Sequence, residues 1–373
     1  MRIGLLAPDL TEAHGWGRYT LDLARMLAAR GDATFVIAAA TGSPREVDLP
    51  HDRYLPILPP LFPSGRWTTP RVLLAVPRLV VALRGCDVIH TTAEHYLPAA
   101  ALVAWLLRRP LFVTAHGTYL PMSVQRRGVG WLFRWAARRA TILPVSHYTA
   151  GRIREALPGL PESAVAVVHN GVHADRFAAL PDALPEKRGP TVLGVGVNKA
   201  RKGFHLLVEA LATVRRTVPD ARCVILGDDR DAAFQRKLRD LVEQHDLGDG
   251  VDILGRVPDD LLRGWYHVAD VFALPALNVG GKFEGFGLVY LEAGAAGLPV
   301  IGTWGCGAEE AIDDGVTGLL VPQGDVAALA DAITRLLTDP DLRARLGAAG
   351  REKAFASTWD HVAAQVRALY EGE

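Results

Sequence analysis

The chain has 373 residues, of which 22% are charged and 49% are hydrophobic, and its formal net charge at pH 7 is zero. This length suits two domains, each of which would bury roughly 70% of its unfolded surface. No run reaches the ~18 apolar residues of a membrane span. The N-terminal MRIGLLAPDL predicts a strand and not a secretion signal, because its apolar run is short and ends at Pro8-Asp9.

Charge is distributed unevenly between the two halves. Residues 1–180 carry 20 arginines and no lysine against 12 acidic residues, a net charge of +8, whereas residues 181–373 carry −8. The three cysteines, Cys86, Cys223 and Cys306, show no C-x-x-C spacing and no histidine at metal-ligand spacing, which argues against disulfides and zinc. We therefore expect a cytoplasmic protein whose halves meet different partners.

Short apolar runs alternate with helical patterns along the chain. The expected strands are Ile3–Ala7, Thr34–Ala39, Val88–His90, Leu111–Ala115, Ile142–Val145, Thr191–Val195, Cys223–Leu226 and Val251–Leu254. Expected helices include Tyr19–Ala29, Phe204–Val214 and two amphipathic ones at 325–337 and 359–370. This alternation predicts an α/β protein with doubly wound parallel sheets. A segment with three prolines, Ala178–Pro190, is the expected linker between two domains, 1–180 and 190–355.

The stretch from Lys282 to Thr303 is the most informative part of the sequence. Glu284 lies in a glycine-bracketed turn, and Glu292 follows eight positions later in a short helical run. Glycines 285 and 287 let backbone N–H groups approach a ligand closely, and the helix N-terminus favours a phosphate. Carboxylates beside an anion site fit a nucleotide-sugar, whose hydroxyls they would bind while amides and nearby cations hold the phosphates.

A second candidate phosphate site is the basic loop Gly196–Gly203, which opens the expected helix Phe204–Val214. Glycine-flanked loops at helix starts bind diphosphates through backbone amides and cations. The alternative is a merely solvated basic loop.

The run EGFGLVYLEA, followed by GLPVI and by DDGVTGLLVPQGD (residues 313–325), resembles the signature of the family-4 retaining glycosyltransferases of GT-B architecture. The resemblance covers nearly the whole chain. It implies two Rossmann-like domains facing across a cleft, the first for the acceptor and the second for the donor, with residues 356–373 crossing back to the first. The implied activity is metal-independent transfer from a UDP- or GDP-sugar to a glycan, lipid-linked or small-molecule acceptor. Two alternatives stay open: an epimerase or hydrolase of the same architecture, and a non-catalytic regulator that binds nucleotide-sugars.

The resemblance also implies roles for individual residues in the second half. The nucleobase would lie at Arg256 and Val257, and the ribose hydroxyls on Glu292. Lys202 and the amides that follow Glu284 would hold the diphosphate, and Glu284 the sugar; those amides belong to Gly285, Phe286, Gly287 and Leu288. In the family an arginine follows the first glycine of the basic loop, but Val197 stands there in this chain. Lys199 or Arg201 would have to replace that arginine.

In the first half, the resemblance implies that the Gly15–Gly17 loop reaches towards the donor phosphates, although a plain tight turn is the alternative. His116 follows the strand Leu111–Ala115, and the resemblance places it facing the transferred sugar, as a catalytic residue with Lys202 and Glu284. The alternative is a histidine that only satisfies a local backbone group. Glu94 and His95 follow another strand end and are weaker candidates for the same edge.

The segment Gln125–Arg139 interleaves arginines with Trp131, Phe133 and Trp135. It fits either peripheral contact with an anionic membrane or core aromatics beside solvated arginines. With the basic first half, it favours a lipid-linked or polysaccharide acceptor at the inner membrane face, and nothing else supports nucleic-acid binding. Asp229 and Asp231 spell D-x-D, which we interpret as a polar loop and not as a metal site.

Overall fold

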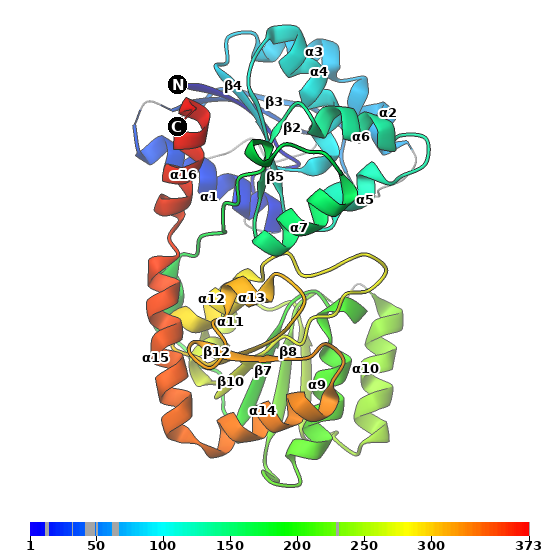
Figure 1. Ribbon diagram of the computed structural model, residues 1–373. Coiled ribbons are helices and arrows are strands. Elements are labelled where there is room, and N and C mark those ends of the chain that lie inside the picture. The colour runs from blue at the N-terminus through cyan, green and yellow to red at the C-terminus, as the bar shows by residue number, and fades with distance from the viewer. Residues whose placement is uncertain are drawn as a thin grey trace. The chain divides into compact units, whose positions relative to one another are not determined.

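The computed structural model describes residues 1–11, 15–31, 33–41, 49, 51–61, 67–228 and 231–372. The chain divides into two compact units, and Figure 1 shows a sheet with flanking helices in each. The first unit comprises Met1–Gly171 together with Trp359–Glu373, and the second comprises Val172–Thr358. The second unit therefore begins several residues before the expected linker.

In its described residues the first unit holds a six-stranded parallel sheet with the order β3-β2-β1-β4-β5-β6. Its strands are β1 (Arg2–Leu6), β2 (Thr34–Ala40), β3 (His51–Leu58), β4 (Val88–Thr91), β5 (Leu111–Ala115) and β6 (Thr141–Pro144). Its helices are α1 (Gly15–Ala29), α2 (Thr68–Leu73), α3 (Val76–Leu83), α4 (Leu97–Leu107), α5 (Tyr119–Val124), α6 (Gly130–Ala137), α7 (His147–Ala156) and α16 (Trp359–Glu371), with the short 3-10 helices η1 (Glu94–Tyr96) and η2 (Glu162–Ala164). This strand order is that of the Rossmann fold.

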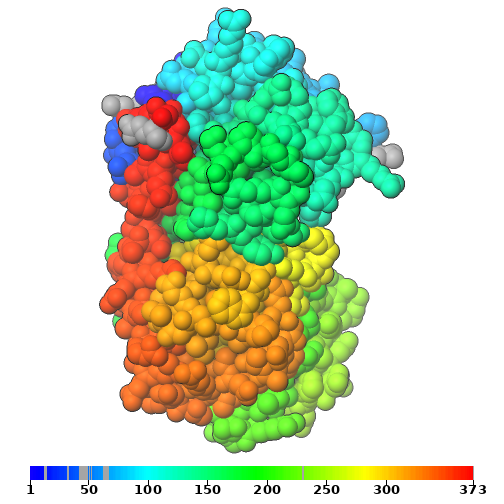
Figure 2. Space-filling view, in the orientation of Figure 1, coloured from blue at the N-terminus to red at the C-terminus, as the bar shows by residue number. Residues whose placement is uncertain are grey.

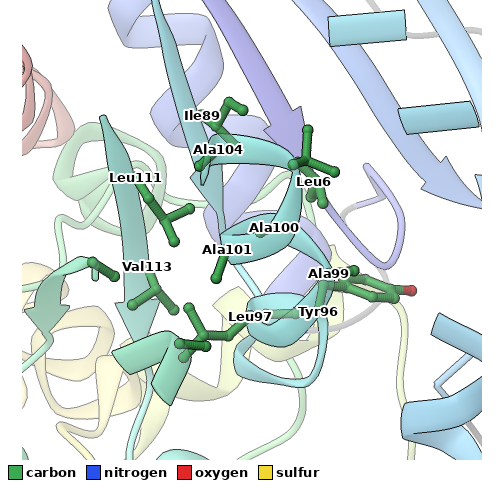
Figure 3. Packing of buried hydrophobic residues seen from close by; sticks show 14 of the residues in the cluster. Leu6, Ile89, Tyr96, Leu97, Ala99, Ala100, Ala101, Ala104, Leu111 and Val113 are labelled. Carbon is green, nitrogen blue, oxygen red and sulfur yellow. The ribbon is translucent and has the colours of Figure 1, made fainter. Parts of the chain in front are cut away.

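Helices cover both faces of the first sheet. Leu6, Ile89 and Val113 pack against α4 on one face (Figure 3), whereas Leu5 and Phe112 belong to a second core cluster with α1 and α16. A sheet buried on both faces requires nearly continuous apolar strands. For that reason β1 and β5 were recognisable from the sequence. Helix α16 lies on the surface of the first unit and is drawn in red in Figure 2.

The second unit has a parallel sheet of six described strands with the order β12-β11-β10-β7-β8-β9. Its strands are β7 (Thr191–Val195), β8 (Arg222–Leu226), β9 (Val251–Gly255), β10 (Val271–Ala273), β11 (Val300–Thr303) and β12 (Gly318–Val321). Its helices are α8 (Ala174–Ala178), α9 (Phe204–Val214), α10 (Ala232–Gln244), α11 (Asp259–Val268), α12 (Leu288–Ala295), α13 (Ala308–Ala311), α14 (Val326–Thr338) and α15 (Pro340–Ala356), with η3 (Ala200–Lys202). Both sheets thus share one strand order, and the prediction of two Rossmann-like domains is confirmed.

The region Leu55–Pro70 has no recognisable sequence pattern, and the end of β3 and the start of α2 lie in it; residues 62–66 are outside the described part. Strand β3 is the edge strand of its sheet and contains Pro56. Proline is tolerated at a sheet edge, where its missing N–H removes no bond, and its presence hid the strand. Among the described helices, none is long and apolar enough to cross a membrane.

Candidate active site

Two cations converge on one carboxylate oxygen in the second unit. Lys202 Nζ lies 2.7 Å and Arg201 Nη1 lies 2.9 Å from Oε2 of Glu284. Lys202 and Glu284 are each only 8% exposed, so water screens their interaction weakly. The structure therefore brings together three of the residues that the sequence singled out, from positions about 80 residues apart.

Backbone geometry fixes this cluster. Gly203 has φ +72° and turns the chain from η3 into α9, and a Cβ there would lie 1.8 Å from the carbonyl oxygen of Pro275. Only glycine fits such a close approach. The carbonyl of Arg201 accepts a hydrogen bond of 2.7 Å from the backbone N–H of Leu277. The basic loop is thereby attached to the segment after β10 that leads to Glu284.

The charges of the cluster are strongly coupled. Burial lowers the pKa of Lys202, and the Glu284 carboxylate only partly opposes this shift. Burial would raise the pKa of Glu284, but the charges of Lys202 and Arg201 outweigh it and hold that pKa below its usual range. A carboxylate with two cations leaves a net charge of about +1 in a buried site. That excess charge suits an anionic ligand.

The turn after Glu284 is held by a second glycine contact. Gly307 donates its backbone N–H to the Glu284 carbonyl at 2.9 Å, and a Cβ on Gly307 would lie 2.0 Å from the carbonyl oxygen of Gly285. Gly287, with φ +86°, then starts α12. Phe286 is buried and Leu288 half-buried at this helix start.

Glu292 lies on the buried side of α12 and is 7% exposed. The hydroxyl of Tyr266, from α11, donates to Glu292 Oε2 at 3.0 Å. Tyr266 thus orients the carboxylate. The sequence offered no signal for this pairing, because the two residues come from elements that are not adjacent in the chain.

In the first unit, His116 follows β5 and bonds to the neighbouring strand end. Its Nε2 lies 3.0 Å from the carbonyl oxygen of Thr92, and its backbone N–H donates to Glu94 Oε1 at 2.9 Å. Because a carbonyl only accepts, Nε2 carries the proton and Nδ1 is left as an acceptor. Burial lowers the pKa of His116 to about 4, against the smaller effect of the Thr92 bond, so the ring is neutral at pH 7.

A buried chain of hydrogen bonds runs beneath His116. Thr114 donates to the hydroxyl of Tyr19 at 3.2 Å, so His90 Nε2 must donate to Thr114 and His90 Nδ1 must accept from Tyr370. The Tyr19 ring contacts the His116 ring edge-on, with centroids 4.6 Å apart. Helices α1 and α16 are thereby tied to the end of β5 where His116 lies.

The two glycines at the start of α1, Gly15 and Gly17, differ in what a side chain at their position would contact. A Cβ on Gly17 would lie 2.0 Å from Asp9 Oδ1, whereas one on Gly15 would meet nothing within 4 Å. Gly17 is thus required by the close approach of Asp9. Among the described residues, no close contact requires a glycine at Gly15.

Comparisons with known proteins agree with this geometry. The family described as Glycosyl transferases group 1 matches residues 177–353, and Glycosyltransferase Family 4 matches residues 13–176. The chain is 34% identical to the GDP-mannose-dependent alpha-(1-6)-phosphatidylinositol monomannoside mannosyltransferase of Mycobacterium tuberculosis, over 81% of this chain and 82% of that protein. It is 32% identical to the phosphatidyl-myo-inositol mannosyltransferase of Mycobacterium leprae, over 100% and 96% of the two chains.

This chain belongs to the family-4 glycosyltransferases. The crystal structure of Anabaena HepE in complex with UDP and glucose covers 100% of both chains with a TM-score of 0.79 at 19% identity, which shows the shared GT-B fold. The protein is therefore a glycosyltransferase of GT-B architecture.

The two candidates to replace the arginine missing at Val197 differ in their contacts, and the replacement itself stays a prediction. In this glycosyltransferase, Arg201 lies beside Lys202 on Glu284, whereas Lys199 is exposed and its side chain has no partner among the described residues. Arg256 is exposed and Val257 half-buried, directly after β9. Their predicted contact with the base stays a prediction.

Two further sequence patterns have local explanations in the described residues. Asp231 caps α10 by accepting from the backbone N–H of Phe234 at 3.1 Å, while Asp229 lies outside the described part. In the Gln125–Arg139 segment, Phe133 belongs to the core, whereas Trp131 is 61% exposed. The third aromatic, Trp135, is half-buried and packs against the core, so both readings of the segment hold for part of it.

Proposed function

We propose that this glycosyltransferase moves a hexose from a nucleotide-diphosphate-sugar to an inositol-lipid or glycan acceptor, with retention of configuration and without a metal ion. GDP-mannose is the first donor to test, because the relatives described above are named as mannosyltransferases and one is named as dependent on GDP-mannose. UDP-sugars are the second choice.

The observation that carries the proposal is the sharing of Glu284 Oε2 by Lys202 and Arg201. On donor binding, the diphosphate takes over hydrogen bonds from both cations and adds those of the amides of residues 285–288. Each charge-assisted bond is worth about 1.5–3 kcal/mol. Glu284 is then released from the cations to accept hydrogen bonds from sugar hydroxyls, and Glu292, oriented by Tyr266, receives the ribose.

In the reaction we propose, the bond between the anomeric carbon and the phosphate oxygen breaks. Lys202 and Arg201 stabilise the charge that develops on the departing diphosphate, an effect that is strong because both cations are already in place. The acceptor hydroxyl oxygen bonds to the anomeric carbon on the same face and passes its proton to the departing phosphate oxygen. Neutral His116 accepts a sugar hydroxyl hydrogen bond at Nδ1, and two cations make a divalent ion unnecessary.

We further propose that the enzyme works in the cytoplasm at the inner membrane face. The arginines of the Gln125–Arg139 segment and the exposed ring of Trp131 supply charge and an amphipathic aromatic side chain for an anionic surface.

Thermal-shift measurements with GDP-, UDP- and ADP-sugars, followed by analysis of products and their anomeric configuration in EDTA, test the proposal. Lys202→Ala should lower turnover at least 100-fold, on the order of the loss of one or two charge-assisted bonds. The matched control Lys237→Ala removes an exposed lysine of α10 and should leave turnover unchanged. Equal turnover in both variants, or a requirement for a divalent ion, would refute the proposal. Release of free sugar at the same rate with and without acceptor would instead indicate a hydrolase.

A further inference from the structure

The C-terminal end of β4 holds two buried polar atoms that have no hydrogen-bond partner in the described part of the chain. Glu94 uses Oε1 to accept from the backbone N–H of His116, but its Oε2 is unpaired, and so is Nδ1 of His95. Glu94 is 0% and His95 8% exposed. A buried polar atom without a hydrogen-bond partner destabilises the folded state, so each of these two atoms calls for a specific explanation. A ligand that supplies the missing partners is one.

Aromatic rings from three elements meet at the same place. The ring centroids of Trp16 (α1) and His95 (η1) lie 5.7 Å apart, those of His95 and Tyr119 (α5) 5.0 Å, and those of Trp16 and Tyr119 4.9 Å. Tyr119 is 37% exposed. This corner therefore combines aromatic walls with a small number of polar atoms, the composition typical of small-molecule sites.

We infer that this corner is the acceptor subsite and that it takes a polyhydroxylated ring, a hexose or a cyclitol. Glu94 Oε2 accepts a hydrogen bond from one hydroxyl, His95 Nδ1 bonds a second, and the apolar C–H face of the ring rests on Trp16 and Tyr119. The inference rests on the proposed function, because it assigns the acceptor of that reaction.

The position of the corner supports this assignment. Ligands of open α/β sheets bind outside the carboxyl ends of the strands, and β4 and β5 end here. Glu94 bonds to the backbone of His116, so a ring held by Glu94 lies next to that histidine. A polyhydroxylated ring fits better than a phosphate, because its hydroxyls can donate to Glu94 when that group is ionised and accept from it when it is protonated, whereas the ionised form would repel an anion. Tyr119 is the partly exposed wall of the corner, so we place the entry of the ring on its side.

Saturation-transfer NMR on the full chain with GDP tests the inference, using methyl α-mannoside and myo-inositol as probes. At least one probe should receive saturation from the wild-type protein. Glu94→Gln and His95→Phe should weaken its binding about 2- to 10-fold each, the effect of one lost hydrogen bond. His95→Phe keeps the ring against Trp16 and Tyr119 while removing both nitrogens. Tyr119→Ala, which removes one aromatic wall, should weaken binding to a similar degree.

The control is Tyr96→Phe, in the same turn, whose hydroxyl bonds to the Pro59 carbonyl at 2.9 Å and not to the subsite. It should keep the probe signal. GDP affinity, measured separately, should be unchanged in all four variants, since it depends on the second unit. Absence of a signal for both probes, or equal binding by wild type, His95→Phe and Tyr119→Ala, overturns the inference. GDP binding by Lys202→Ala tests the proposed function and not this subsite. Loss of GDP binding in that variant supports the proposed function, and retention of GDP binding contradicts it.

Discussion

The cluster around Glu284 leads to a quantitative prediction for the double variant Arg201→Met/Lys202→Met. Because both cations bond to the same oxygen, either single variant leaves Glu284 with one partner, and each should cost about 1–2 kcal/mol of unfolding free energy. The double variant leaves a buried carboxylate with no cation, which typically costs about 3–5 kcal/mol. The effects should therefore exceed additivity by about 1 kcal/mol. Adding Glu284→Gln should recover most of the loss, since the uncompensated charge is removed.

Hydrogen exchange of peptides from α12 gives the unfolding free energy of the second unit without assuming that the whole chain unfolds in one step. The lowered pKa of Glu284 also determines the direction in which the unfolding free energy changes with pH. The pKa of Glu284 is lowered in the folded state, so its contribution is present above the unfolded carboxyl pKa and is lost as the pH falls through the folded value. Strict additivity of the two single variants, or no recovery on adding Glu284→Gln, would refute the view that both cations share one carboxylate.

Three further predictions concern single positions. Burial raises the pKa of Glu94 to about 7, so the unfolding free energy of the wild type should fall as the pH rises from about 4.5 through 7. Measured by urea unfolding and taken relative to Glu94→Gln, this free energy should be about 2–3 kcal/mol lower at pH 8 than at pH 5. No difference would contradict the buried carboxyl. Gly203→Ala should lower the melting temperature and abolish nucleotide binding, because its Cβ would meet the Pro275 carbonyl. The control Gly297→Ala, with φ +79° and no described atom near its Cβ, should lower the unfolding free energy by only about 1 kcal/mol. Equal losses of stability in the two variants would contradict the close contact at Gly203. Tyr370→Phe leaves His90 Nδ1 without a donor and should cost about 1–3 kcal/mol in thermal unfolding, and an unchanged melting temperature would argue against the buried chain.

Most of the fold could be predicted from the sequence, because strands buried on both faces are recognisable by composition alone. Strands β5 and β7 have the predicted bounds, β2, β4, β8 and β9 are one residue longer at one end, and β1 and β6 are shifted by one residue. Strands β3, β10 and β12 were not predicted. An edge strand with Pro56 and a charged start, such as β3, lacks the apolar run that marks the central strands.

The candidate site was predicted unevenly. Motif spacing identified Glu284, Glu292 and Lys202, because a turn before a helix has a local glycine pattern. It left open which cation replaces the arginine absent at Val197, and that replacement stays a prediction. Spacing also could not show which of the two side chains reaches a carboxylate about 80 residues away in the chain. Arg201 reaches it and Lys199 does not.

The sequence by itself determined the family, the alternation of strands and helices and the positions of the glycine turns, since these depend on local conformation and on residue order. Only the tertiary structure decided that Arg201 and Lys202 share one oxygen, that Tyr266 orients Glu292, and that Glu94 Oε2 and His95 Nδ1 are buried without partners. The reason is physical: hydrogen-bond partnership and burial depend on distances between atoms from different elements, and linear spacing carries no information about those distances.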